Sequence, residues 1–192
     1  MMKKMKAAAA VMLAVLIGFA AMSCAKKDDA AGKEIVLSSY RDGSIDQLDA
    51  ASYMGPHFLY KMIYEGFVED GGNGEIIPVL AESWDIAPDN KTYTFHLRRG
   101  VKFSDGTDFD ADAVIFNMKR WVNNSRYASL TSSKVANMTA LDDHTVEIVF
   151  EDAFYPILTE LTYPRPVRFL SPASVTDESG GIAFKMPVGT GP

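Results

Sequence analysis

The sequence predicts a mixed α/β (α+β) fold, because strand-like and helix-like segments alternate along the chain. Three pairs of short β-prone runs enclose turn residues, and segments with a helical spacing of apolar residues lie between them. Hydrophobic residues make up 47% of the 192 residues and charged residues 23%, which is typical of a globular domain. Hairpins interspersed with helices favour a mixed fold over an all-β fold.

The N-terminus has the pattern of a secretory signal peptide. Three lysines among the first six residues precede a charge-free apolar run over residues 7–21. This run is shorter than the roughly 20 residues that span a bilayer. The run ends in Ala21-Met22-Ser23-Cys24, which resembles a bacterial lipobox and implies that Cys24 becomes the lipidated first residue of the mature protein. Ordinary signal-peptidase cleavage nearby is the alternative.

Three parts are expected along the chain. Residues 1–23 are expected to form the signal peptide, 24–33 a short, charged and flexible tether, and 34–192 the folded part. The last residues, Pro187–Pro192, have a loop composition with no element after them. We therefore expect the folded part to be a fragment of a longer domain, exported to the periplasm or the cell surface.

The first elements of the folded part are a strand and a helix. The run Glu34–Tyr40 is β-prone and predicts the first strand. An amphipathic helix is expected within Gly55–Phe67. Its apolar face is predicted to consist of Phe58, Met62 and Ile63, with Leu59 beside them.

Turn residues and alternation predict three hairpins. Glycines at residues 71–74 supply the positive φ angles of the first turn. The second hairpin pairs Ser83–Ala87 with Lys91–Leu97, where apolar and polar residues alternate, and the third pairs Val135–Ala140 with Thr145–Phe150. Two further helices are expected, one capped by Asp110 and running to Val122, and one over Phe154–Leu161.

Composition excludes several classes of function. A net charge of −6 argues against a nucleic-acid partner, because phosphate binding needs clustered Lys and Arg. One cysteine and three histidines are too few for an ordinary structural zinc site. Four carboxylates lie within residues 105–112, but an EF-hand loop would need Gly and Glu where the chain has Ala113 and Lys119. We interpret this acidic run as a turn followed by a helix N-terminus.

No catalytic constellation is visible. The chain has no Gly-x-Ser-x-Gly elbow, and its only cysteine belongs to the signal region. A secreted hydrolase that uses acids such as Glu82 and Asp105 is a remote alternative. His96 and His144 are expected on strand or turn surfaces, whereas His57 begins the first helix and is kept as a candidate for a binding site.

One segment predicts a binding function more directly. Arg165 and Arg168 lie in Tyr163-Pro164-Arg165-Pro166-Val167-Arg168-Phe169, where the two prolines favour an extended backbone. A guanidinium on such a stiff segment loses little entropy when it binds a carboxylate through two hydrogen bonds. A structural ion pair explains the same arginines equally well, so both interpretations stay open.

Several blocks of the chain resemble the signature of the family 5 solute-binding proteins, the large receptors of peptide and nickel ABC importers. The resemblance runs from about Glu34 to the last residue. It implies a fold like that of the type II periplasmic binding proteins, with this chain supplying the first part of lobe one of a two-lobe hinged receptor. The blocks are Leu80–Trp84, Lys91–Arg98, Gly100–Gly106, Phe109–Ala111 and Val188–Pro192.

Within this family, Tyr155–Leu161 followed by Pro164–Phe169 resembles the nickel-binding branch. There the metal is held by a small carboxylate-bearing chelator, and the arginine that matches Arg165 contacts the carboxylates. Other contacts come from residues before the first helix, where this chain has Tyr53, Met54 and His57. The branch has a tryptophan after the capped helix, and this chain instead has Arg126 and Tyr127 nearby.

The resemblance thus implies capture and delivery of a nickel–chelate complex to an ABC permease, without a resident cofactor, by a protein attached to the membrane through its lipid. A receptor for dipeptides or oligopeptides is the alternative. A third possibility is that the fragment does not fold or act alone.

Overall fold

The computed structural model describes residues 36, 38–39, 43–51, 55–122, 130–154, 156–164, 167–175 and 184–191. Contacts divide the chain into two compact units, Met1–Ser38 and Ser39–Pro192, and the described helices and strands all belong to the second unit. The predicted signal peptide, the tether and Cys24 lie outside the described residues. None of the described helices is long and apolar enough to cross a membrane.

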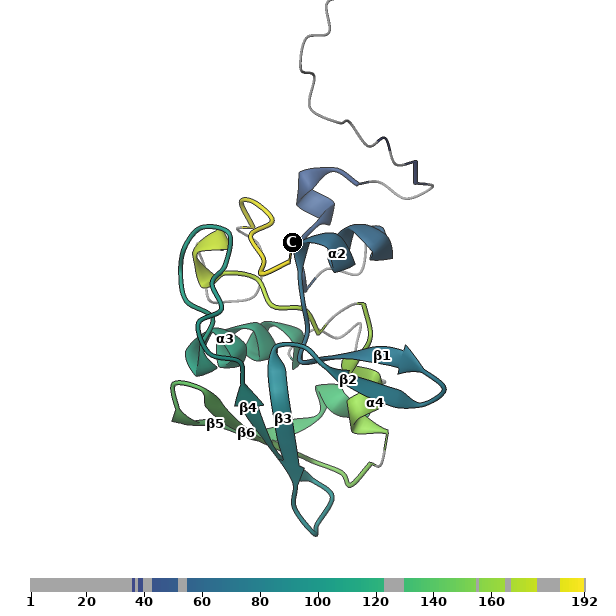
Figure 1. Ribbon diagram of the computed structural model, residues 1–192, viewed down its shortest axis with the longest axis vertical. Coiled ribbons are helices and arrows are strands. Elements are labelled where there is room, and N and C mark those ends of the chain that lie inside the picture. Colours follow the sequence, from purple (N-terminus) through teal and green to yellow (C-terminus); the bar gives the residue numbers. More distant parts are fainter. Residues whose placement is uncertain are drawn as a thin grey trace, which may run out of the picture. The chain divides into compact units, whose positions relative to one another are not determined.

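Two antiparallel sheets and several helices confirm the predicted mixed α/β class (Figure 1). The larger sheet has the strand order β3-β4-β6-β5, and the smaller one pairs β1 with β2. The strands are β1 (Val68–Gly72), β2 (Glu75–Pro78), β3 (Ala81–Ile86), β4 (Thr92–Leu97), β5 (Val135–Asp142) and β6 (Thr145–Phe150). The helices are α2 (His57–Ile63), α3 (Ala111–Val122) and α4 (Ile157–Leu161), and the 3-10 turns are η1 (Ile45–Gln47), η3 (Thr131–Ser133) and η4 (Pro172–Ser174).

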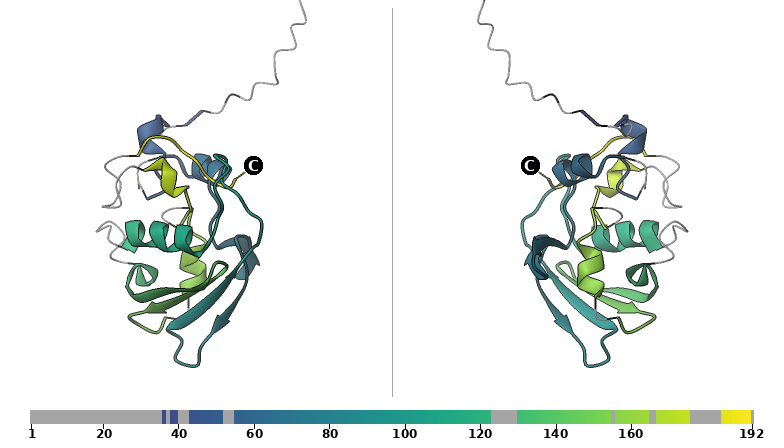
Figure 2. Two further views of the ribbon diagram at one scale, coloured as in Figure 1. Left: turned by 90° about the vertical axis from the view of Figure 1, so that its left-hand side faces the viewer. Right: turned by 90° about the vertical axis from the view of Figure 1, so that its right-hand side faces the viewer.

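The inner strands of the larger sheet bury every second side chain. On β4 these are Tyr93, Phe95 and Leu97, and on β6 they are Val146, Ile148 and Phe150. Because side chains alternate between the two faces of a strand, both strands present one apolar face to the same core. Helix α3 packs against β5 and β6, as Figure 2 shows.

Helix α3 forms as predicted. The Asp110 carboxylate accepts a hydrogen bond of 2.8 Å from the Ala113 backbone N–H, which satisfies one of the free donors of the first turn. Val114, Met118 and Trp121 are buried against the sheet. The N-cap and the inward face therefore match the sequence pattern.

The three predicted hairpins are present, with strand ends shifted by a few residues. In the first turn Asn73 and Gly74 have φ angles of 55° and 84°, the pair of positive values that a two-residue hairpin turn requires. Asn90, with φ of 54°, lies in the turn between β3 and β4. His96 lies on β4 and His144 in the turn before β6, as expected.

Other predictions were only partly right. Of the predicted strand Glu34–Tyr40, only Val36, Ser38 and Ser39 are described, and none of them is in a strand. The helix expected within Gly55–Phe67 spans only His57–Ile63, because Tyr64 is already extended and Phe67 stacks on Phe95 with ring centroids 4.4 Å apart. Helix α4 begins after Pro156 and is likewise shorter than predicted.

The apolar face assigned to α2 was only partly right, because Ile63 packs against the buried group around Tyr60 while Phe58 and Met62 are exposed. Phe58 and Met62 are 38% and 49% exposed, whereas Tyr60 and Tyr64 are fully buried. A buried tyrosine needs a partner for its hydroxyl, and both have one: Tyr60 donates to the Gln47 carbonyl and Tyr64 to the Leu48 carbonyl, each at 2.7 Å. Hydrogen bonding to the preceding segment thus decides which face turns inward.

Candidate functional site

Most of the predicted ligand residues lie outside the described residues. This holds for Arg165, Tyr53, Met54, Arg126 and Tyr127, and for the lipidation candidate Cys24. His57 is described and is the exposed first residue of α2. What the structure describes is how the flanks of these segments are held.

Six residues hold these flanks together, and we call them the anchor cluster. Ala50 and Leu170 pack with Tyr60 and Tyr64 in one buried apolar group, apart from the main core. Three polar residues join this group from two further places in the chain, Asp49 beside Ala50 and both Asn117 and Arg120 on α3. The anchor cluster consists of Asp49, Tyr60, Tyr64, Asn117, Arg120 and Leu170.

The centre of the anchor cluster is a buried ion pair. Nη2 of Arg120, in the last turn of α3, lies 2.7 and 2.9 Å from the two carboxylate oxygens of Asp49. The Arg120 side chain is 1% exposed and that of Asp49 is 11% exposed. The guanidinium also lies 6.0 Å from the ring centroid of Phe116, within cation–π range.

Tyr64 borders this pair. Burial, and next the nearby Asp49 carboxylate, raise the pKa of Tyr64 well above its usual value. The phenol therefore stays protonated across the physiological range and remains a hydrogen-bond donor to Leu48.

The stretch after Pro166 is fixed on both sides. The side-chain amide of Asn117 donates to the Leu170 carbonyl at 2.8 Å, and its oxygen accepts from the Leu170 N–H at 3.1 Å. On the other side, the Phe169 N–H donates to the Glu65 carbonyl at 3.0 Å. Residues 167–171 therefore connect α3 with the chain just after α2, and we call them the strap.

Arg168 in the strap serves a structural ion pair. Its side chain is fully buried and its Nη1 donates to the Glu69 carboxylate, which also binds Lys61 at 2.7 Å. Burial by itself would raise the pKa of Glu69, but the hydrogen bonds from Arg168 and Lys61 outweigh it and lower this pKa. Of the two interpretations left open for the arginines, the structural one holds for Arg168.

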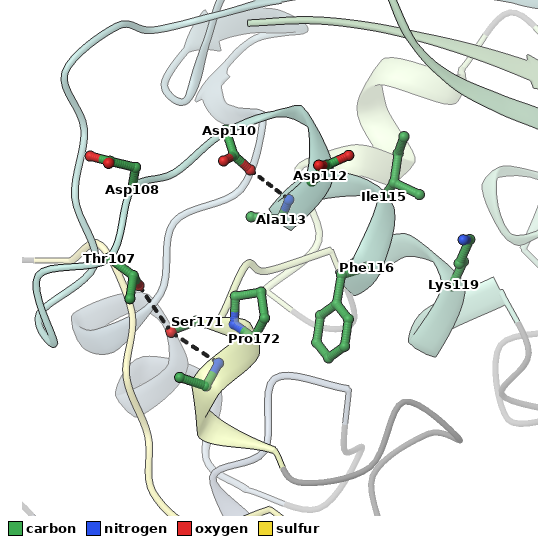
Figure 3. Close-up of a pocket in the computed structure, with 11 residues that line it drawn as sticks. Thr107, Asp108, Asp110, Asp112, Ala113, Ile115, Phe116, Lys119, Ser171 and Pro172 are labelled. Carbon is green, nitrogen blue, oxygen red and sulfur yellow. Dashed lines mark hydrogen bonds between the residues drawn. The ribbon is translucent and has the colours of Figure 1, made fainter. Parts of the chain in front are cut away.

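A cavity of about 830 Å³ lies at the N-terminal half of α3 (Figure 3). The carboxylates of Asp108, Asp110 and Asp112 and the ammonium of Lys119 lie around it, over apolar walls that include Phe116 and Pro172. Three carboxylates against one ammonium do not suit the anionic ligand expected at Arg165. His57, the one predicted ligand residue that the structure describes, does not line this cavity.

Carboxylates of the acidic run 105–112 bind other groups of the same domain. Asp110 caps α3, Asp108 pairs with Lys102, and Asp105 binds Thr107 and Ser171. In the part of the chain that is described, no three His, Cys, Asp or Glu side chains gather as a metal site would require. The interpretation as a turn followed by a helix N-terminus is confirmed.

The anchor cluster was not found from the sequence. Two signals were present in retrospect: Tyr60 and Tyr64 have the i, i+4 spacing of one helical face, and Arg120 follows Asn117 by three residues on the side of α3 that turns inward. A buried arginine on a packed helix needs a carboxylate partner. The partner is Asp49, 71 positions earlier in the chain, and only the tertiary structure brings the two residues together.

Known proteins are similar in sequence to much of this chain. Residues 75–192 match the profile of the bacterial extracellular solute-binding proteins, family 5. The nickel-binding periplasmic protein of Escherichia coli K12 is 39% identical over 137 residues, which are 70% of this chain and 26% of that protein. The glutathione-binding protein GsiB of Pectobacterium atrosepticum is 38% identical over 151 residues, 78% of this chain and 29% of that protein.

A solved structure of a protein from the same class is similar to this chain as well. NikA from Brucella suis in complex with Fe(III)-EDTA superposes with a TM-score of 0.75 at 32% identity, covering 81% of this chain and 32% of NikA. The relatives are described as binding proteins and not as enzymes. The chain spans between a quarter and a third of the length of these proteins.

Proposed function

Because the chain belongs to the family 5 bacterial extracellular solute-binding proteins, we propose that it forms part of the solute-binding subunit of an ABC importer. Its task is capture of a ligand outside the cytoplasmic membrane and delivery to the permease, not turnover. The names of the relatives support this role, since they are binding proteins for small solutes.

The proposed cargo is nickel held by a small carboxylate-bearing chelator. The identity of 39% to a nickel-binding protein supports this choice, and so does the likeness to a structure that contains a metal held by EDTA. A chelate of this kind presents carboxylate oxygens, which an arginine fork recognises through two parallel hydrogen bonds. Arg165 is the residue to which we assign that contact.

The anchored strap is the observation that carries this assignment. Arg168 is neutralised by Glu69, so it is not available to an anionic ligand. Leu170 and Phe169 fix the strap to α3 and to the chain just after α2. Arg165 precedes this fixed stretch by two residues, and its two flanking prolines favour an extended backbone, so we expect its guanidinium to lose little entropy on binding.

A peptide-like cargo is the second candidate. The glutathione-binding relative matches a larger share of this chain, 78%, at 38% identity. Glutathione and short peptides also carry carboxylates, but they present amide groups and a free amine that a metal chelate lacks. The two cargo classes are therefore separable by titration.

Calorimetry on the protein expressed from its complete reading frame tests both candidates. We expect heat on titration with Ni²⁺ plus L-histidine or a tricarboxylate, and none with glutathione or a dipeptide. Arg165→Ala should abolish chelate binding, while Arg165→Lys should retain part of it, because a lysine keeps the charge but not the fork. Binding of glutathione or dipeptide alone, unaffected by Arg165→Ala, would establish the second candidate instead.

Attachment to the membrane through a lipid on Cys24 completes the proposal. It rests on the lipobox-like sequence before that residue and places the receptor in the periplasm or on the cell surface. A tether of charged and small residues would let the domain reach the permease while it stays anchored.

A further inference from the structure

The turn between β1 and β2 consists of Asn73 and Gly74, and both residues are exposed. In an Asn-Gly pair the backbone nitrogen of the glycine can attack the side-chain amide carbon of the asparagine, because glycine has no Cβ that obstructs the approach. The φ angles of 55° and 84° show that the turn itself requires a glycine at the second position. The residue that the turn needs is therefore also the residue that leaves the Asn73 side chain open to attack.

The tip of this hairpin has little support from the rest of the domain. β1 and β2 form a sheet of two strands, and a two-stranded hairpin is only marginally stable by itself. Val68 is buried, but from Asp70 to Glu75 every residue is exposed. The strand register also shifts between Asp70 and Gly72, which interrupts the ladder beside the turn. We therefore expect the tip to open locally more often than the core, and an open tip lets the Gly74 nitrogen turn toward the Asn73 side chain.

The other described asparagines lack this combination. Asn73 is the only asparagine of the chain that precedes a glycine. Asn90 is exposed and has nearly the same φ of 54°, but Lys91 follows it. Asn117 is buried in α3 with both ends of its amide hydrogen-bonded, and Asn137 lies inside β5 before a methionine. Asn90 is thus the matched internal control for Asn73.

The Asp105-Gly106 pair shows how the fold can block the same chemistry. One carboxylate oxygen of Asp105 accepts from the Ser171 hydroxyl at 2.6 Å. The other accepts from the Thr107 hydroxyl and backbone N–H at 2.6 and 2.9 Å. These hydrogen bonds favour the anion, which reacts poorly with a nitrogen nucleophile, and they hold both oxygens away from Gly106.

We propose that Asn73 is a modification site, at which the protein converts its own asparagine to isoaspartate and aspartate in water. The Gly74 nitrogen gives up its proton to solvent and forms a bond to Cγ of Asn73. The bond from Cγ to the side-chain nitrogen breaks, and ammonia leaves. One water molecule then opens the cyclic imide, giving isoaspartate when it attacks the main-chain carbonyl and aspartate when it attacks the side-chain carbonyl. No electrons are exchanged, and the reaction does not depend on the cargo.

The modification changes a hairpin that carries a buried ion pair. Isoaspartate adds one methylene group to the main chain of a two-residue turn, so the two strands no longer meet in register. Glu69 on β1 pairs with Ile77 on β2, and its carboxylate binds Lys61 and the fully buried Arg168. We therefore expect the aged protein to hold Glu69, and through it Arg168 of the strap, less firmly.

Peptide mapping of the full chain after storage in mildly alkaline buffer tests the site. We expect the peptide with Asn73 to gain the mass that accompanies replacement of NH₂ by OH, and to become a substrate for an isoaspartate methyltransferase. The rate at Asn73 should exceed the rate at Asn90 by at least about tenfold, because only Asn73 has a glycine after it. An Asn73 that stays unmodified, or equal rates at the two asparagines, would overturn the proposal.

Two variants separate the chemistry from its consequence. Asn73→Gln keeps an amide but needs a larger ring, so we expect no change in mass or melting temperature on storage. Asn73→Asp, measured fresh, carries the new charge without the added methylene. Aged wild type that contains isoaspartate should melt at a lower temperature than fresh wild type and than Asn73→Asp. If it melts like Asn73→Asp, the hairpin tolerates the longer turn and the predicted loosening of Glu69 is wrong.

Discussion

Asp105 and Ser171, 66 positions apart in the sequence, are joined by a hydrogen bond of 2.6 Å from the Ser171 hydroxyl to the Asp105 carboxylate. The same hydroxyl oxygen accepts from the Ala173 N–H at 3.2 Å and so caps η4. The Asp-Gly turn before α3 is therefore fastened to the end of the strap. This contact gives the acidic turn a structural task that its sequence alone did not reveal.

Removal of the Ser171 hydroxyl should destabilise the domain. Ser171 is fully buried, and alanine leaves its partners without a donor and an acceptor. We expect Ser171→Ala to lower the free energy of unfolding by about 1–2 kcal/mol. Urea titration followed by tryptophan fluorescence measures the change, and an unchanged midpoint would show that the bridge contributes nothing.

The Asp105 carboxylate should make stability depend on acid pH. Burial by itself would raise its pKa, but hydrogen bonds from Ser171 and Thr107 outweigh it and hold the pKa below the usual 3.8. A carboxyl whose folded pKa is depressed stabilises the fold above its unfolded pKa, and this contribution is lost as the pH falls through the folded pKa. The difference in stability between the wild type and Asp105→Asn should therefore be constant above pH 5 and shrink below about pH 4. A difference that does not change over this range would contradict the assignment.

Glu69→Gln should destabilise the domain strongly. It leaves the fully buried Arg168 guanidinium without its counter-charge. We expect a loss of about 3 kcal/mol, as for other broken buried pairs. Lys61→Ala, which removes the half-exposed partner of the same carboxylate, should cost at most about 1 kcal/mol. Equal effects of the two variants in thermal melts would show that burial of Arg168 does not matter.

Gly189→Ala should disrupt the contact between the C-terminal loop and α2. A Cβ at this position would lie 1.9 Å from the Ile63 carbonyl oxygen, which is backbone and cannot turn away. We expect a loss of about 3 kcal/mol from this overlap. Gly43→Ala is the matched control, because its Cβ meets the flexible end of Leu59 at 3.1 Å and the Pro56 ring at an ordinary contact distance of 4.0 Å. Melting temperatures of the two variants give the comparison, and similar values would argue against the close packing.

Cys24→Ser should release the protein from the membrane. If Cys24 carries the lipid, the wild type partitions with membranes and the serine variant appears in the soluble or secreted fraction. Intact mass measurement of the wild type should then show an added diacylglycerol group. A soluble wild type with an unmodified or absent Cys24 would instead indicate ordinary signal-peptidase cleavage.

The periodic parts of the fold were predictable because each depends on local pattern. The hairpin with Tyr93, Phe95 and Leu97 follows from alternation, and α3 follows from Asp110 with a helical spacing of apolar residues. The inward face of α2 was predicted only in part, because the choice between Phe58 and Tyr60 depends on the Gln47 carbonyl, which lies 13 residues from Tyr60 in the chain. Spacing within one element carries no information about such partners.

The sequence predicted the kind of ligand site, but it did not predict the residues that hold the surrounding chain in place. Arg165 was singled out by its proline-flanked sequence and by family resemblance, and that assignment remains a prediction. The role of Arg168 was left open, and a single contact with Glu69 decides it. Asp49 and Arg120 were missed, since an isolated acid and an isolated arginine look like surface residues until the fold brings them together.

The strand order of the larger sheet has a consequence for the order of folding. The pairs β3–β4 and β5–β6 are local hairpins, of a kind that forms within about 1–10 μs, whereas β4 meets β6 only after the chain between residues 97 and 145 has been brought back. Closing that long loop delays the central pairing relative to both outer ones. Until it happens, each hairpin exposes aromatic and branched residues, so the nascent chain is most prone to aggregation just before its two halves join.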